Sequence, residues 1–262
     1  MALYTDIAAE IYPPSRGTCP RGVRTHTASA AGVSLTRVDI TRDGLRRPRG
    51  CYITLDMPDF ARIDDRNEAY VLAVASQLRS LVPREGPVLV AGIGNDDVTA
   101  DAIGPQTAKR VFTTRALPDA DGELDLRCVA AVAPGVRAAT GISAAEMLRG
   151  AVKAMCPGAV VCVDSLCTAD VRRLGCSVQL STAGLNPLSA DALTEQTLGV
   201  PVVAVGVPTV MEAHVKSKSG PLVVTPRDIY SIVRRASSLL ALALNKALQP
   251  SLSVGELSFL TS

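Results

Sequence analysis

Two aspartates, Asp101 and Asp164, stand at positions where side chains can carry out acid and base chemistry. Asp164 directly follows the apolar run of residues 159–163, and Asp101 follows the apolar run of residues 88–91 after a short polar turn. Short apolar runs of this kind are typical of buried parallel strands. Because open α/β sheets place their chemistry at the carboxyl ends of the strands, we expect both carboxyl groups at one edge of a sheet.

A pair of carboxyl groups in one site can supply both an acid and a base. At about 4 Å and an effective dielectric constant near 20, the repulsion between two carboxylates is about 4 kcal/mol, or roughly three pKa units. One member then keeps its proton while the other is ionised. Such a pair can activate a water molecule and protonate a leaving amine. The simpler alternative is that Asp101 caps its helix and Asp164 bonds to a neighbouring turn.

The glycines in the turn after residues 88–91 resemble part of a nucleotide-binding motif, but the acidic residues of this turn argue against nucleotide binding. Gly92 and Gly94 follow an apolar run, but the full dinucleotide pattern needs a third glycine where Asp97 stands. A pyrophosphate would also meet like charge at Asp96 and Asp101. The sequence contains no Walker lysine motif, so no nucleotide cofactor is expected.

Ser165 and Cys167 follow Asp164 and are candidate nucleophiles, although small residues in a tight turn are the simpler interpretation. Nucleophilic catalysis needs a neighbouring base, but His26 lies in the N-terminal region and His214 in a predicted polar loop. The seven cysteines form no CxxC pair, and neither histidine is spaced as a ligand partner. We therefore expect a reducing compartment, with neither a disulfide framework nor a zinc site.

The elements that must position the two aspartates alternate between strands and helices. The predicted strands are residues 33–40, 51–55, 88–91, 126–132, 159–163, 177–180 and 201–207. The predicted helices are residues 62–81, 101–114, 143–155 and a last helix that ends near 248, with Thr225 as its cap and Pro226 at its first position. This alternation predicts an α/β fold with a mainly parallel sheet flanked by helices. We expect one domain over residues 1–262, in which residues 1–50 form an N-terminal arm.

The composition excludes some classes of protein. The net charge of +2 is too small to indicate nucleic-acid binding. We interpret the cluster of Arg46, Arg47 and Arg49 as part of a solvated loop. The N-terminus lacks the basic and apolar regions of a signal peptide, and the apolar residues 239–244 are too few to cross a bilayer. We therefore expect neither a nucleic acid nor a membrane as a partner.

Six motifs occur in order along the chain, at residues 92–105, 133–142, 163–166, 195–202, 205–210 and 224–228. The first reads GIGNDDVTADAIGP and the third reads VDSL. Together with residues 5–8, 32–33 and 54–55 of the arm, they resemble the germination proteases of spore-forming bacteria. The resemblance covers nearly the whole chain.

This resemblance implies an atypical aspartic endopeptidase that degrades small acid-soluble spore proteins during germination, in the cytoplasm of the spore core. The two functional aspartates of the family correspond to Asp101, in V-T-x-D-A-hydrophobic-G-P, and to Asp164, in hydrophobic-D-small-L. The implied fold is the phosphorylase/hydrolase-like α/β fold that hydrogenase maturation endopeptidases share. The resemblance also implies a homo-oligomer and suggests a tetramer. We expect no cofactor and, because no histidine follows at a suitable position, no catalytic metal.

Members of this family are made as zymogens and remove a short N-terminal segment themselves. The bond that they cut lies in a sequence with an acid, an apolar residue, Ala and a later Glu. Asp6-Ile7-Ala8-Ala9-Glu10 is similar to that pattern. The resemblance therefore predicts a propeptide of about residues 1–6 and self-cleavage between Asp6 and Ile7.

The chain departs from the family pattern in two places. Residues 181–188 differ in composition and are fewer than in the family, and a long insert of the family is almost absent between Val210 and Val224. These departures affect substrate range and oligomer contacts rather than the two aspartates. Two other functions stay open. A metal-dependent maturation protease of hydrogenase type would lose activity on chelation, whereas a non-enzymatic binding domain would keep every function in Asp164→Asn.

Overall fold

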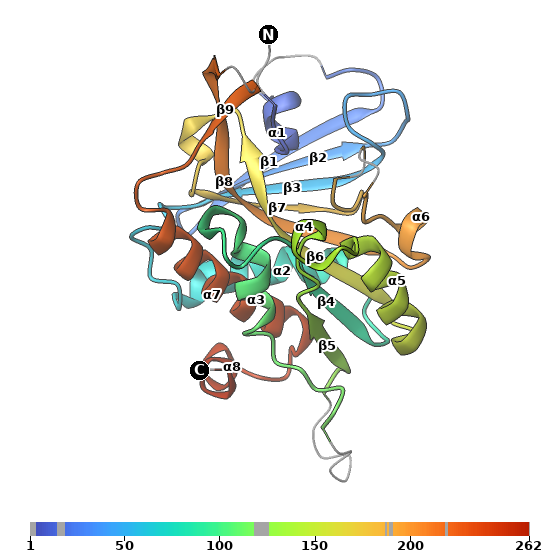
Figure 1. Ribbon diagram of the computed structural model, residues 1–262. Helices are drawn as coiled ribbons and strands as arrows, with labels where there is room; N and C mark the ends of the chain where they lie inside the picture. The colour runs from blue at the N-terminus through green and yellow to red at the C-terminus, as the bar shows by residue number, and fades with distance from the viewer. Residues whose placement is uncertain are drawn as a thin grey trace.

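In the computed structural model, which describes residues 4–14, 19–117, 126–186, 188, 191–217 and 220–261, nine strands form one sheet (Figure 1). Neighbouring strands follow the order β1-β2-β3-β7-β8-β6-β4-β5, and β9 pairs with β8. The strands are β1 (Val23–Ala30), β2 (Val33–Ile40), β3 (Gly50–Asp56), β4 (Val88–Gly92), β5 (Val129–Val132), β6 (Ala159–Thr168), β7 (Ser177–Ser181), β8 (Val202–Ser217) and β9 (Gly220–Val224).

Helices cover both faces of this sheet. The helices are α1 (Ala8–Ile11), α2 (Glu68–Leu81), α3 (Ile103–Ala108), α4 (Arg137–Thr140), α5 (Ala144–Met155), α6 (Glu195–Leu198), α7 (Ile229–Leu248) and α8 (Val254–Leu260), with short 3-10 helices η2 (Thr99–Asp101) and η3 (Val171–Arg173). Figure 1 shows α2, α3 and α7 on one side of the sheet and α5 and α6 on the other. The predicted α/β fold with a sheet flanked by helices is confirmed.

The sheet is mixed. β5, β4, β6 and β8 are parallel to one another, whereas β1, β2, β3, β7 and β9 join by antiparallel pairing. The predicted strands at residues 33–40 and 51–55 are confirmed, and they pair with each other, with Leu35 opposite Leu55. β1 was not predicted from the sequence, because most of its side chains are exposed and it lacks a clear alternation of apolar and polar residues.

Two apolar clusters, one on each face of β6, form most of the core. Val161 and Val163 pack in the cluster that includes α2 and α7, whereas Val160 and Cys162 pack in the cluster that includes α5. Because both faces of β6 are buried, its sequence is a nearly continuous apolar run. Among the described residues, none of the helices combines the length and apolar character needed to cross a bilayer.

The last long helix begins later than predicted. Its first residue is Ile229, and its N-cap residue is Asp228, whose side chain makes no capping hydrogen bond. The Thr225 hydroxyl instead donates to the carbonyl oxygen of Thr209 at 2.8 Å, so Thr225 ties the chain to β8 rather than to the helix. The expected roles of Thr225 as cap and of Pro226 as first helical residue are therefore wrong.

Two other segments differ from the prediction. The helix expected over residues 101–114 is divided into η2 and the short helix α3. β8 continues to Ser217, so that His214 lies in a strand and not in the predicted polar loop. By contrast, the helix predicted over residues 143–155 is confirmed as α5, whose N-terminus is capped by reciprocal hydrogen bonds between Ser143 and Glu146.

Candidate active site

Asp101 is held by the turn that follows β4. The backbone amide of Asn95 donates a hydrogen bond to Asp101 Oδ2 at 2.8 Å. Gly94 has a φ of +119°, and a Cβ atom there would lie 2.1 Å from the Asp101 carbonyl oxygen. A glycine is required at this point because both the backbone angle and the close approach exclude a side chain.

Asp164 lies within β6, just beyond the end of β4. The pairing of β4 with β6 ends at Gly92 and Val163, and on the other side Asp164 lies opposite Gly206 of β8. Gly206 in turn lies opposite Gln179 of β7, so these three residues form a row across three strands. The Asp164 side chain is buried, and its Oδ1 accepts a hydrogen bond from the Ser165 amide at 2.8 Å.

The structure places Asp101 and Asp164 close enough for their charges to interact. Burial, and after it the charge of Asp101, raises the pKa of Asp164 to about 8. Burial also raises the pKa of Asp101, while the hydrogen bond from Asn95 acts in the opposite direction. The arrangement therefore favours a protonated Asp164 beside an ionised Asp101 at neutral pH. The simpler interpretation does not describe these bonds: Asp101 caps none of the described helices and accepts from Asn95 in the preceding turn, and Asp164 accepts from the next residue of its own strand. Both bonds restrict the orientation of the carboxyl groups.

The residues of the predicted self-cleavage site lie beside this pair. The charge of Asp6 also raises the pKa of Asp164, as the smallest of its causes. The Asp6 amide donates to the carbonyl oxygen of Cys167 at 2.8 Å, three residues beyond Asp164 on β6. Ile7 is fully buried in the same apolar cluster as Leu166. Residues 1–3 of the predicted propeptide lie outside the described residues.

The other candidate nucleophiles lack the partners that nucleophilic catalysis needs. The Ser165 hydroxyl is buried and has no hydrogen-bond partner in the part of the chain that the structure describes. Burial raises the pKa of Cys167 to about 11, so this thiol stays protonated near neutral pH. His26 lies in β1 at the far edge of the sheet, and the side chain of His214 is outside the described residues.

The acids of the turn after β4 do not add to a metal site. Among the described residues, no group of three or more His, Cys, Asp and Glu side chains could hold a metal ion. Asp96 is exposed and forms an ion pair with Lys109, and Asp97 is exposed as well. Two carboxyl groups are fewer than the three protein ligands typical of a catalytic zinc site.

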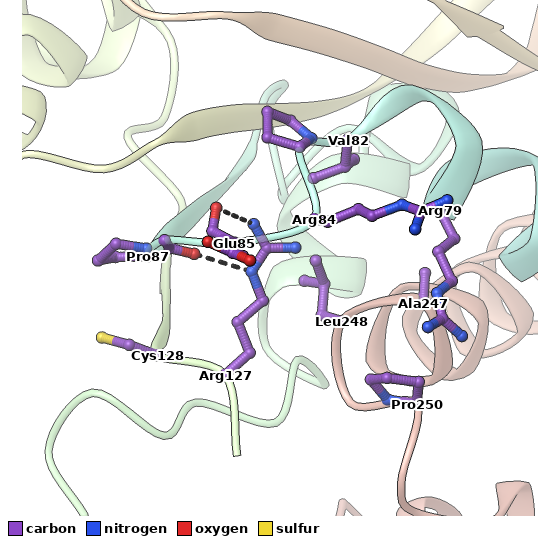
Figure 2. Close-up of a pocket in the computed structure, with 12 residues that line it drawn as sticks. Arg79, Val82, Arg84, Glu85, Pro87, Arg127, Cys128, Ala247, Leu248 and Pro250 are labelled. Carbon is purple, nitrogen blue, oxygen red and sulfur yellow. Dashed lines mark hydrogen bonds between the residues drawn. The ribbon is translucent and has the colours of Figure 1, made fainter. Parts of the chain in front are cut away.

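A separate cavity of about 530 Å³ lies near the amino ends of β4 and β5 (Figure 2). The Arg127 guanidinium donates to the carbonyl oxygens of Gly86 and Glu85 at 2.8 and 3.0 Å, as Figure 2 shows. These bonds join the segment before β5 to the segment before β4. The cavity contains neither aspartate and lies at the opposite ends of the strands, so we do not assign it to the catalytic chemistry.

The sequence does not predict the role of two residues beside Asp6. Arg47, which was interpreted as part of a solvated loop, is buried and lies 3.5 Å from Asp6 Oδ1. Gln179 is also buried, and its side chain bonds to the backbone of Asp6 and Ala8. No local sequence pattern identifies either residue, because the contacts join segments far apart in the chain.

We expect the Asp164→Asn variant to be more stable than the wild type at pH 8 and equally stable near pH 4. Between these values the unfolded chain releases the Asp164 proton, whereas the folded chain, with a pKa of about 8, retains it. Rising pH therefore favours unfolding, by up to about 1.4 kcal/mol per pH unit, until the folded group also ionises. The asparagine oxygen can still accept the Ser165 hydrogen bond.

Thermal unfolding of both proteins from pH 4 to pH 8 measures this difference. The exposed Asp96→Asn variant, in the turn next to the site, serves as the control and should show the pH dependence of the wild type. Equal pH dependence in Asp164→Asn and the wild type would show that the Asp164 pKa is close to the usual value.

Comparison with known proteins gives one consistent family. The sequence model of the germination protease family matches residues 16–220. The germination protease of Clostridium acetobutylicum is 30% identical over 319 aligned positions, which cover 97% of this chain and 97% of that protein. The germination protease of Caldanaerobacter subterraneus is 35% identical over 230 residues, covering 81% of this chain and 70% of that protein.

Among solved structures, a NiFe hydrogenase maturation protease from Thermococcus kodakarensis shows 20% sequence identity and a TM-score of 0.37. The aligned region covers 64% of this chain and 98% of the chain of that maturation protease. The sequence comparisons are the informative ones, since both the family match and the similarity to whole proteins extend over most of the chain. This chain therefore belongs to the germination protease family.

Proposed function

We propose that this chain is an endopeptidase that uses Asp101 and Asp164 to activate water, and that its substrates are the small acid-soluble spore proteins degraded at germination. The observation that carries the proposal is the burial of Asp164 next to Asp101, which favours one shared proton at neutral pH. The family supplies the class of reaction, since its members are named as proteases of germination. The proposed location is the cytoplasm of the spore core.

The two carboxyl groups have different tasks in the proposed reaction. Ionised Asp101 accepts a proton from a water molecule, whose oxygen attacks the carbonyl carbon of the peptide bond. Protonated Asp164 gives its proton to the leaving amine as the carbon–nitrogen bond breaks. After this step Asp101 is protonated and Asp164 is ionised. Transfer of the proton from Asp101 to Asp164 restores the starting state.

The test of the activity is incubation of the purified protein with a small acid-soluble spore protein, followed by mass spectrometry of the fragments. We expect internal cleavage that is unchanged when a chelator is added, because two carboxyl groups suffice for the proposed reaction. Loss of cleavage on chelation, with recovery on adding a metal ion, would favour the metal-dependent alternative. An intact substrate under all conditions would contradict the proposed activity.

We also expect the full-length protein to process itself between Asp6 and Ile7. Asp6 binds the Cys167 amide, three residues beyond Asp164 on β6, and its charge raises the pKa of Asp164; both observations support this choice of bond. N-terminal sequencing of protein incubated under the same conditions should therefore give a chain that begins at Ile7. A chain that still begins at Met1 or Ala2, in protein that cleaves its substrate, would contradict self-processing but not the endopeptidase activity.

A further inference from the structure

The carboxylate of Asp6 lies in a buried polar pocket. Asp6 Oδ2 accepts a hydrogen bond from the Cys167 amide at 2.9 Å, and Oδ1 lies 3.5 Å from Arg47 Nη2. The side chains of Arg47 and Asp6 are only 9% and 15% exposed. The Tyr4 hydroxyl donates to Oδ1 at 2.7 Å. Because hydrogen bonds to a charged group are stronger than neutral ones, this pocket favours a carboxylate over a neutral side chain.

The backbone on either side of Asp6 is held by bonds that any residue could make. The Asp6 amide donates to the Cys167 carbonyl oxygen at 2.8 Å, and the Asp6 carbonyl oxygen accepts from Gln179 Nε2. The Ala8 amide donates to Gln179 Oε1 at 3.0 Å. These contacts position the peptide without regard to its sequence. Selection for an acidic side chain must therefore come from Arg47 and the Cys167 amide.

Two partners of the Arg47 guanidinium, the Asp6 carboxylate and a backbone oxygen, belong to the N-terminal segment. The guanidinium donates to the carbonyl oxygen of Thr5, in the segment that self-processing would remove. Departure of residues 1–6 would remove the Asp6 carboxylate and the Thr5 carbonyl oxygen from Arg47 together, and would leave its guanidinium without these partners and more open to solvent. Next to this position is a small cavity of about 30 Å³ lined in part by Arg47, Gln179 and Asp6 itself. Removal of Asp6 would enlarge it into a site for another acidic residue.

We propose that Arg47 determines specificity for an acidic residue immediately before the cleaved bond, in substrates as well as in the chain's own N-terminal segment. This inference rests on the proposed endopeptidase function and on the resemblance, which supplies the acid before the cleaved bond. The structure adds the residue that would bind this acid. In this view Asp6 occupies the site that the acidic residue of a substrate later takes. The segment around Asp6 therefore blocks the site until it is removed.

The test compares synthetic peptides that carry the sequence of residues 4–12 with Asp, Glu or Asn at the position of Asp6. The wild type should cleave the Asp and Glu peptides with a kcat/KM about 10- to 100-fold above that of the Asn peptide, as expected for the loss of a largely buried ion pair. Arg47→Gln should reduce this preference to about threefold or less. Exposed Arg46→Gln, which changes the same residue type at the neighbouring position, should retain the wild-type preference.

The preference is a ratio measured on one protein sample, so partial unfolding of Arg47→Gln does not alter it. A variant that cleaves all three peptides with the wild-type preference would overturn the role of Arg47 and leave the endopeptidase function intact. A wild-type protein that cleaves neither these peptides nor the spore proteins would overturn both proposals. A full-length Asp6→Asn variant should process itself more slowly than Asp6→Glu, and equal rates would also overturn the role of Arg47.

Discussion

Asp101→Asn and Asp164→Asn should each lower kcat for peptide hydrolysis by about 10²- to 10⁴-fold, the usual effect of removing a general acid or base. Neither asparagine can accept or donate a proton at the required step, although each can keep the local hydrogen bond to Asn95 or Ser165. KM should change little, because the proposed peptide contacts involve other residues. Initial rates with a saturating spore-protein substrate measure the effect.

The pH dependence of the wild type should distinguish the two roles. Burial, Asp101 and Asp6 together raise the pKa of Asp164 to about 8, against the hydrogen bond from the Ser165 amide. Activity should therefore fall above about pH 8, where Asp164 loses the proton that it donates. On the acid side, activity should fall at a pH above the usual aspartate pKa, because burial raises the pKa of Asp101.

Asp96→Asn is the control for these substitutions, since Asp96 is an exposed acid in the same turn. It should retain activity within about twofold, as expected for a surface change that does not touch the reacting groups. Full activity of Asp164→Asn in a correctly folded protein would contradict the proposed mechanism. Absence of substrate hydrolysis from the wild type as well as from the variants would instead favour the non-enzymatic alternative.

Gly104→Ala should destabilise the protein and displace Asp101. A Cβ atom at Gly104 would lie 2.1 Å from the carbonyl oxygen of Ile93 and 2.4 Å from that of Val163. Both are backbone atoms of the segments that position the site, so α3 must move away from the sheet. The expected cost is about 1–3 kcal/mol or more, the usual range for overpacking, and a decrease in Tm of at least several degrees.

Gly150→Ala is the matched control for this prediction. Gly150 lies within α5, where an added Cβ atom would meet nothing within 4 Å. Alanine there should leave Tm unchanged or raise stability by about 0.4–1 kcal/mol, because it restricts the unfolded chain. Calorimetric unfolding of both variants measures the difference. A Gly104→Ala protein as stable and as active as Gly150→Ala would show that α3 can move without cost to the site.

The parallel part of the fold and the positions of the two aspartates follow from local sequence patterns. β4 and β6 are apolar because they are buried on both faces, and this property is visible in the sequence. The rule that chemistry gathers at the carboxyl ends of parallel strands then correctly predicts a shared edge for Asp101 and Asp164. Their catalytic roles remain a proposal.

The parts that were not predicted depend on contacts between distant segments. β1 is mostly exposed and is a strand because it pairs with β2, not because of its own pattern. The burial of Arg47 depends on a segment about forty residues earlier, whereas its neighbours suggest a solvated loop. Thr225 has the local features of a helix cap, but its hydroxyl bonds to Thr209 of β8 instead of to the helix.

The row of Asp164, Gly206 and Gln179 across β6, β8 and β7 has a consequence for the shape of a polypeptide bound as proposed. Asp164 and Gln179 are separated by two inter-strand spacings, or about 10 Å at roughly 4.8 Å each. About three residues of extended chain cover this distance, whereas three residues of an α-helix advance only about 4.5 Å. A helix would need about seven residues to cover the same distance. In the proposed reaction, therefore, an unfolded substrate would bring fewer of its residues between Asp164 and Gln179 than a helical one.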